Sequence, residues 1–230
     1  MTDPSPAPVL EMIGVEHAYR RTVALRGVTL TVQAGEVVAV TGPSGCGKST
    51  LLHAAAGIVR PQAGTVRLLG EDLATLDETA RTRLRRRRVG IVLQFGQLVP
   101  DLSVVENVAL PLLLDGHERR AARTAAIEWL ARAGFDEDAD APPSELSGGQ
   151  AQRVAVARAL VAGPAVLFAD EPTGSMDMLG GEQLLELLLG AASERGVAVV
   201  LVTHDNVVAA HADREVRLRD GRVETEAVLR

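Results

Sequence analysis

Cysteine is almost absent from this sequence of 230 residues. The single one, Cys46, cannot close an internal disulfide, and no CxxC pair offers a zinc or redox site. A disulfide-stabilised secreted scaffold is therefore excluded, and a reducing compartment, by default the cytosol, is expected. The chain is long enough to bury a sizeable core, so it does not need such cross-links to fold.

Long apolar runs and an excess of positive charge are also lacking. The longest apolar stretch, residues 159–169, contains Gly163 and Pro164 and is shorter than the roughly 18 residues that a membrane-spanning helix needs. The N-terminal segment lacks the basic and apolar regions of a signal peptide. Acidic residues outnumber basic ones by 30 to 24, and the net charge of −6 argues against a dedicated nucleic-acid-binding protein. We therefore expect a cytoplasmic chain that holds any anionic ligand by local geometry.

Strand-like and helix-like segments alternate along the chain. Short apolar runs, typical of parallel strands covered on both faces, occupy residues 37–40, 89–93, 166–169 and 197–202. Helical patterns occupy residues 48–56, 103–113, 119–133, 150–161 and 182–194. The N-terminal region differs, because an antiparallel β pattern covers residues 11–19 and 28–32. This order predicts an α/β fold with an N-terminal antiparallel β piece.

Helices follow one another without an obvious strand after residue 94. We therefore expect a helical subdomain over residues 95–162, inserted into a core that is built from residues 1–94 and 163–230. Because no linker or repeat divides the sequence, the whole chain is expected to form a single domain.

A glycine-rich segment connects the strand predicted at residues 37–40 to the helix that follows. It consists of Gly42, Pro43, Ser44, Gly45, Cys46, Gly47, Lys48, Ser49 and Thr50, which fit the phosphate-loop pattern. Glycines let backbone N–H groups surround a phosphate, and the new helix points its positive end at that phosphate. Lys48 is placed to reach the β and γ oxygens, and Ser49 to hold Mg²⁺. The alternative is an ordinary glycine-rich turn with an exposed lysine; Cys46 is interpreted as a small loop residue, not a nucleophile.

Two carboxylates follow the apolar run at residues 166–169. Asp170 is placed at the end of the predicted strand, where it can bind Mg²⁺ directly or through water. Glu171 comes next along an extended chain, so it is expected to point the other way and to polarise an attacking water as a general base. The alternative is a solvated acidic strand end before Pro172.

A second helix start with glycines lies at residues 146–150, with the sequence LSGGQ. Ser147 and Gln150 have the spacing of a capping box, so the positive end of a helix is exposed here. Gly148 and Gly149 allow an anion to approach that end closely. The segment predicts a second phosphate-binding site, with an ordinary capped helix as the alternative.

With these motifs in place, the sequence resembles the ATP-binding-cassette family over nearly its whole length. The segment LSGGQ, with Gln152, Arg153 and residues 157–160 after it, looks like the signature of that family. The resemblance implies a P-loop NTPase (RecA-like) core and an ATPase with ATP and Mg²⁺ as cofactors. It also implies that the signature covers ATP held by the phosphate loop of a second copy. The chain is thus expected to be half of a head-to-tail ATP sandwich dimer.

The resemblance assigns roles to four further residues. Tyr19 matches the aromatic residue that stacks on adenine, and Asp177 belongs to the loop through which the two copies communicate. Gln94 matches the glutamine that contacts Mg²⁺ and the attacking water, and His204 matches the γ-phosphate switch. Glu171, His204 and Gln94 are then the expected catalytic residues, and the expected metal ligands are Ser49, Gln94 and Asp170. Tyr19 as a cover of the β region and His204 as a capped strand end are the alternatives.

Four shorter segments give a finer resemblance. Residues 69–73, the arginine-rich residues 81–88, and residues 98–100 and 106–112 look like the lipoprotein-release and macrolide-export branch. That branch implies a separate four-span permease with a large extracytoplasmic domain, with export or mechanotransmission as the output. The chain would then be peripheral on the inner face of the cell membrane. A regulatory ATPase that couples ATP state to a cell-division or cell-wall membrane partner is the alternative, whereas a DNA-repair role would call for zinc modules or coiled coils that the sequence lacks.

Six arginines lie between residues 81 and 88. A solvated helix face is expected, because most charge runs of this kind are solvated. Contact with anionic lipid headgroups or with a membrane subunit is the alternative, and nucleic acid is disfavoured by the net charge.

Overall fold

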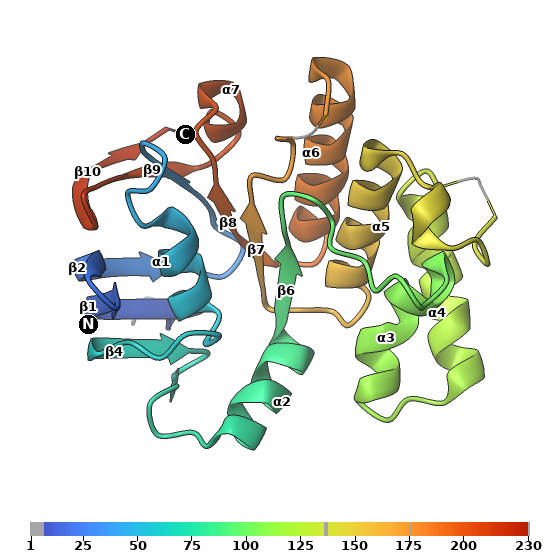
Figure 1. Ribbon diagram of the computed structural model, residues 1–230, viewed down its shortest axis with the longest axis horizontal. Coiled ribbons are helices and arrows are strands. Elements are labelled where there is room, and N and C mark those ends of the chain that lie inside the picture. The colour runs from blue at the N-terminus through green and yellow to red at the C-terminus, as the bar shows by residue number, and fades with distance from the viewer. Residues whose placement is uncertain (1–6, 136–137, 175, 230) are drawn as a thin grey trace, which may run out of the picture. The chain divides into compact units, whose positions relative to one another are not determined.

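The computed structural model describes residues 7–135, 138–174 and 176–229, and the N-terminal segment considered above lies partly outside this range. Its contacts divide the chain into two compact units, residues 1–82 with 198–230 and residues 83–197 (Figure 1). Both units contain strands and helices, which confirms the α/β class. The subdomain boundaries at residues 95 and 162 stay a prediction.

The first unit contains an antiparallel sheet in the order β2-β1-β4-β5. Its strands are β1 (Leu10–Tyr19), β2 (Thr22–Val32), β4 (Ala63–Leu68) and β5 (Glu71–Asp72). The antiparallel piece predicted at the N-terminus is therefore confirmed, although β2 begins well before residue 28 because Tyr19 and Thr22 already pair across the turn.

Parallel strands in the same unit support the glycine-rich segment. Strand β3 (Val37–Thr41) pairs in parallel with β8 (Ala198–Val202) and with β9 (Arg214–Arg219), and β10 (Arg222–Val228) is antiparallel to β9. Helix α1 (Lys48–Ala55) contacts β1, β2 and β4 of the antiparallel sheet and the parallel strand β8, and its Leu51 and Leu52 are fully buried. The short helix α7 (Asn206–Ala209) contacts β3. The loop between β3 and α1 is thus fixed at both ends by buried apolar residues.

The second unit is built around one helix, α5 (Gly148–Leu160). It contacts strand β6 (Val89–Val92) and the helices α3 (Val104–Leu114), α4 (Arg119–Arg132) and α6 (Met178–Ser193). Strand β6 pairs in parallel with β7 (Val166–Asp170), and a single 3₁₀ turn covers Pro143–Glu145. Residues 154–157 of α5 are fully buried, because helices or a strand pack on several of its faces. None of the described helices has both the length and the apolarity that a bilayer crossing requires.

The arginine run lies on helix α2 (Glu78–Arg88), and its expected solvation is wrong at Arg81. Arg81 is only 6% exposed, and its aliphatic stem packs against Gly57, where an added Cβ would lie 3.3 Å from Arg81 Cδ. Arg86 and Arg87 both form ion pairs with Asp115 at the end of α3. The run therefore serves partly as structure, since a periodic charge pattern does not show which members find partners.

Candidate nucleotide-binding site

The glycine-rich loop has a backbone that only glycine tolerates at two positions. Gly42 and Gly47 have φ values of 144° and 110°. A Cβ at Gly42 would lie 2.1 Å from the carbonyl oxygen of Leu218, and one at Gly47 would lie 2.3 Å from that of Ala24. The loop is therefore fixed by close backbone contacts as well as by conformation.

Lys48 lies inside this loop and is only 8% exposed. Its Nζ donates hydrogen bonds to the carbonyl oxygens of Gly42 at 2.7 Å and Pro43 at 3.1 Å. Helix α1 begins without a side-chain cap, because its N-cap residue is Gly47, and the next residue, Ser49, is exposed in the first turn. Backbone N–H groups, an ammonium group and a hydroxyl therefore meet at one helix start, which fits the phosphates of a nucleotide.

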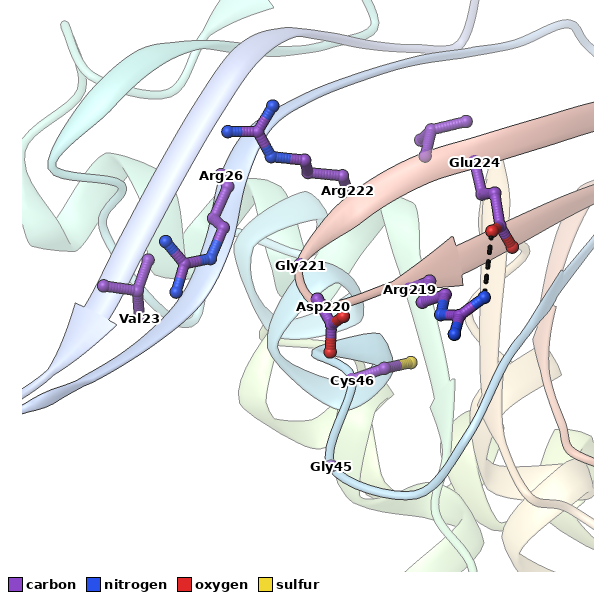
Figure 2. A pocket seen from close by; sticks show the side chains of 10 residues that line it. Val23, Arg26, Gly45, Cys46, Arg219, Asp220, Gly221, Arg222 and Glu224 are labelled. Carbon is purple, nitrogen blue, oxygen red and sulfur yellow. Dashed lines mark hydrogen bonds and ion pairs between the residues drawn. The ribbon is translucent and has the colours of Figure 1, made fainter.

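The loop is braced by the turn between β9 and β10 (Figure 2). The N–H of Gly221 donates to the carbonyl of Cys46 at 2.9 Å, and the N–H of Arg26 donates to the carbonyl of Gly221 at 2.8 Å. Asp220 and Gly221 have φ values of 48° and 77°, as a type I′ hairpin turn requires. A cavity of about 710 Å³ lies beside Gly45 and Cys46, between β2 and this turn. Sequence reasoning missed this brace, although the Asp-Gly pair at residues 220–221 is a signal that predicts a two-residue hairpin turn.

Two of the residues assigned by resemblance lie in the same unit. Tyr19 ends β1 and is 47% exposed, with its ring edge-on to His17 at a centroid distance of 4.6 Å. The ring is thus supported from one side and open to a stacking partner. His204 is exposed directly after β8, where Thr203 and Asp205 form a tight turn through a hydrogen bond of 3.0 Å from the Asp205 N–H to the Thr203 hydroxyl. Both are accessible, and their roles stay predictions.

The second unit holds the two carboxylates. Strand β7 ends at Asp170, as predicted. The expectation that Glu171 continues the extended chain is wrong, because its φ is 46°, in the left-handed region that a non-glycine residue rarely adopts. Such a conformation costs about 1 to 3 kcal/mol and is found preferentially at functional sites. The strand period therefore does not set the direction of this side chain; the turn does.

Gln94 lies close to the turn that follows these carboxylates. A Cβ at Gly174 would lie 3.1 Å from Gln94 Nε2, and Gly174 itself donates to the carbonyl of Glu171 at 3.1 Å. Any larger residue at position 174 would therefore push against the Gln94 amide. Within this unit the structure brings Gln94 and the turn at residues 171–174 together, as the assignment of both to one hydrolytic centre requires.

The LSGGQ segment forms the predicted capping box. Ser147 Oγ accepts from the Gln150 N–H at 3.3 Å, and Gln150 Oε1 accepts from the Ser147 N–H at 2.7 Å. Ser147 and Gly148 are exposed, and a Cβ at Gly149 would lie 3.3 Å from the Met176 side chain. Helix α5 therefore presents its positive end at the surface, which confirms the helix start predicted here.

Asp177 has a structural contact of its own. Its carboxylate accepts from the Gly180 N–H at 2.8 Å and so caps helix α6. This cap explains why α6 begins at Met178, before the predicted start at residue 182, despite Gly180 and Gly181 in its first turn. The neighbouring Ser175 lies outside the described residues.

Two side chains of α5 have contacts that the motif did not reveal. Gln152, which is fully buried, and Arg158 both donate to backbone carbonyls around Gln94. Their position in the signature helix could have marked Gln152 and Arg158 as functional candidates. The sequence pattern of a helix does not show which loops its side chains contact.

These features define a class of protein: one with a phosphate-loop fold that binds a nucleotide at the start of a helix. Solved structures agree: the dimeric post-hydrolysis state of the ATP-binding cassette MJ0796, bound to ADP and Pi, superposes with a TM-score of 0.91 at 38% identity, covering 96% of this chain and 99% of that one. The P-loop NTPase fold predicted from the sequence is thereby confirmed.

The family named ABC transporter matches residues 25–174. The lipoprotein-releasing system ATP-binding protein LolD 2 of Caulobacter vibrioides is 45% identical over 225 residues, which are 96% of this chain and 99% of the relative. The macrolide export ATP-binding/permease protein MacB of Salmonella choleraesuis is 41% identical over 94% of this chain but only 34% of its own length. The chain belongs to the ABC transporter family, as an ATP-binding cassette with ATPase activity.

Proposed function

We propose that two copies of this chain assemble head to tail and hydrolyse two Mg·ATP between them to drive a separate membrane permease. The observation that carries the proposal is the contrast between two helix starts in one chain. The loop at residues 42–48 is a braced cradle with a buried lysine, whereas the signature at Ser147 lies exposed on another unit. The dimer seen for the related cassette supports the same arrangement.

Each polar group has a chemical task in this proposal. Loop N–H groups and Lys48 hold the β and γ phosphates, and Tyr19 stacks on the adenine. Hydroxyl, amide and carboxylate oxygens are the hard ligands that Mg²⁺ prefers, and here they come from Ser49, Gln94 and Asp170. These residues would hold Mg²⁺, which would supply charge neutralisation at the phosphate oxygens.

Hydrolysis needs a water held in line with the γ phosphate and a group that takes its proton. Glu171 is the general base in this proposal, and His204 contacts the γ phosphate. Ser147, Gly148, Gly149 and Gln150 cover that phosphate from the second copy, and Asp177 lies at the contact between copies. Catalysis then rests on positioning and charge stabilisation, with direct transfer of the phosphoryl group to water.

The membrane partner is inferred from the relatives and from one exposed side chain. LolD is named as part of a lipoprotein-releasing system, and MacB carries a permease in the same chain. Phe95 is 67% exposed directly after Gln94, where contact with a cytoplasmic loop of a permease would reach the hydrolytic centre. We infer a four-span permease with a large extracytoplasmic domain, used for export or mechanotransmission, and a peripheral place on the inner face of the membrane.

Glu171→Gln tests the proposal, because it removes the base and keeps the shape. ATP binding should persist, turnover should fall by about 10² to 10⁴-fold, and ATP should convert the variant into a stable dimer, measured by light scattering after size exclusion. Glu186→Gln, an exposed change on α6, is the control that should behave like the native chain. Rapid turnover by Glu171→Gln, or a monomer at saturating ATP, would contradict the proposal.

A pull-down identifies the partner. The tagged Glu171→Gln protein, loaded with ATP, should recover a permease with a large external domain from gently solubilised membranes. Recovery of soluble proteins alone by a variant that binds ATP and dimerises would argue for a regulatory ATPase.

A further inference from the structure

Helix α5 carries polar side chains beyond its exposed start. Its first residues form the signature, whereas Gln152 and Arg158, further along the helix, reach the backbone on either side of Gln94. All of these residues belong to the second unit. One rigid element therefore connects the surface that meets a second copy with two loops of this copy's own hydrolytic centre.

Gln152 is fully buried, and its amide bridges two backbone segments. Nε2 donates to the carbonyl oxygen of Leu93 at 2.8 Å and to that of Pro172 at 2.9 Å. Leu93 directly precedes Gln94, and Pro172 directly follows Glu171. A single amide group thus ties together the chain segments that carry the proposed water-binding glutamine and the proposed base.

The carbonyl oxygen of the same side-chain amide indicates why position 152 holds a glutamine. Gln152 Oε1 is buried, and within the described residues it accepts no hydrogen bond. Leaving a buried acceptor unsatisfied is costly, so an apolar residue of similar length would fill this space more cheaply. The two N–H donors, and not the volume, are therefore the reason for glutamine at this position.

Arg158 adds a second connection from the same helix. Its two terminal nitrogens donate to the carbonyls of Gly96 at 2.7 Å and Gln97 at 3.0 Å, just after Gln94. Burial lowers the pKa of the Arg158 guanidinium below its ordinary value. Gln97 has a φ of 45°, so the turn that Arg158 holds is itself a strained one.

We propose that Gln152 is a positioning residue that makes the signature helix and the pair Gln94 and Glu171 move together. The proposal rests on the head-to-tail dimer proposed above. When the start of α5 engages nucleotide held by the other copy, its displacement is passed through Gln152 Nε2 to the carbonyls of Leu93 and Pro172. Each site is then competent for hydrolysis only when the opposite site is filled, which is positive coupling between the two sites.

Two substitutions remove the donors in different ways. Gln152→Met keeps an unbranched side chain of similar length without an N–H group, and Gln152→Glu places a carboxylate oxygen against two carbonyl oxygens. Gln183→Glu is the matched control, because Gln183 is exposed in the same unit and its Oε1 accepts a hydrogen bond from Arg153 at 3.0 Å. Arg158→Lys, which keeps the charge and loses the two-pronged donor geometry, tests the connection independently should the Gln152 variants not fold.

The experiment compares steady-state hydrolysis, ATP binding and dimerisation. For Gln152→Met we expect kcat to fall by about tenfold to a hundredfold, because misplacing a catalytic group by about 1 Å costs that much. The Hill coefficient for ATP should fall towards 1, whereas the Kd for ATP of the isolated chain should stay within about twofold, since the phosphate loop lies in the other unit. Gln152→Met in the Glu171→Gln background should still form the ATP-dependent dimer.

Three results would separate this inference from its alternatives. A native kcat and Hill coefficient in folded Gln152→Met and Gln152→Glu, or in Arg158→Lys if neither folds, would overturn it. A fall in kcat that matches only a lower melting temperature, with unchanged Hill coefficient, would assign Gln152 a merely structural role and also overturn it. If native protein does not hydrolyse ATP and Glu171→Gln does not dimerise, the proposed function itself fails, and the inference fails with it.

Discussion

Two helix starts in this chain use the same backbone chemistry in opposite ways. Helix α1 begins after Gly47 with no side-chain cap, next to a lysine that is only 8% exposed. Helix α5 begins at an exposed Ser147 whose hydroxyl already accepts from the helix backbone. The start of α1 leaves its backbone N–H groups available to a ligand and encloses them. The start of α5 satisfies part of its backbone hydrogen bonding with its own side chains and is exposed to solvent.

This difference explains why one start can act alone and the other cannot. The phosphate loop is closed by backbone contacts of Gly42 and Gly47 and by the brace at Gly221, so contacts within this chain fix its shape. The signature has no wall opposite its positive end in the described part of its own unit, because Ser147 and Gly148 face solvent. In the proposed dimer, the phosphate loop of a second copy supplies the rest of that site.

Gly47→Ala is expected to have the largest effect, because it breaks the preformed start. The new Cβ would lie 2.3 Å from the Ala24 carbonyl at a φ of 110°, so the backbone must shift. We expect a loss of about 3 kcal/mol or more of unfolding free energy in urea, together with loss of ATP binding.

Gly45→Ala is the control for Gly47→Ala, since its φ is also positive but an added Cβ meets nothing within 4 Å. The free energy of unfolding of Gly45→Ala should fall by only about 1 to 2 kcal/mol. Equal losses for the two variants would show that backbone conformation alone, and not the close contact, shapes the loop.

Ser147→Ala tests the exposed start of α5. Removing the cap should lower the free energy of unfolding by about 1 kcal/mol and leave ATP binding by the isolated chain unchanged. Turnover and ATP-dependent dimerisation should fall, because the hydroxyl no longer reaches the nucleotide of the second copy. Parallel measurements of unfolding, ATP affinity and hydrolysis check all three parts.

Ser103→Ala provides the control, because Ser103 and Glu106 form the same capping box on α3 with the same Oγ to N distance of 3.3 Å. Its stability loss should match that of Ser147→Ala, whereas its turnover should stay native. A loss of turnover in Ser103→Ala as large as in Ser147→Ala would mean that the signature acts through stability alone.

Asp115→Asn should have the smallest effect and is confined to the unit that carries the signature. Hydrogen bonding by Arg87, and then by Arg86, holds the pKa of Asp115 below its ordinary value of 3.8. The depressed pKa means that the carboxylate stabilises the folded state above pH 3.8 and that this contribution is lost as the pH falls below it.

Thermal unfolding at several pH values tests this expectation. The melting temperature of Asp115→Asn should lie slightly below the native value at pH 6, and the difference should shrink as the pH falls below 3.8, because Asp115 is then protonated and loses its charge while Arg86 and Arg87 keep theirs. Asp101→Asn, at an exposed loop position, is the control. A difference that stays constant with pH would assign the effect to packing.

The sequence predicted those parts of the site that depend on local backbone rules. The strand, glycine loop and helix at residues 37–56 and the capping box at Ser147 follow from spacing, and the structure confirms these elements. The buried stem of Arg81 was missed because its contact, Gly57, lies far away in the sequence, and the left-handed Glu171 was missed because the extended strand was expected to continue past Asp170. The contacts of Gln152 were missed for the same reason.

The central claim is that the signature of one copy covers the nucleotide held by the loop of the other. The native chain has one cysteine, Cys46, in that loop, so Leu146→Cys in the Glu171→Gln background places a second thiol beside Ser147 without removing its hydroxyl. Oxidation in the presence of ATP should give a covalent dimer on a denaturing gel. No covalent dimer should form when ATP is omitted or when Cys46→Ser is added to the variant. A covalent monomer, with both thiols joined within one chain, or no cross-link in protein saturated with ATP, would contradict the claim.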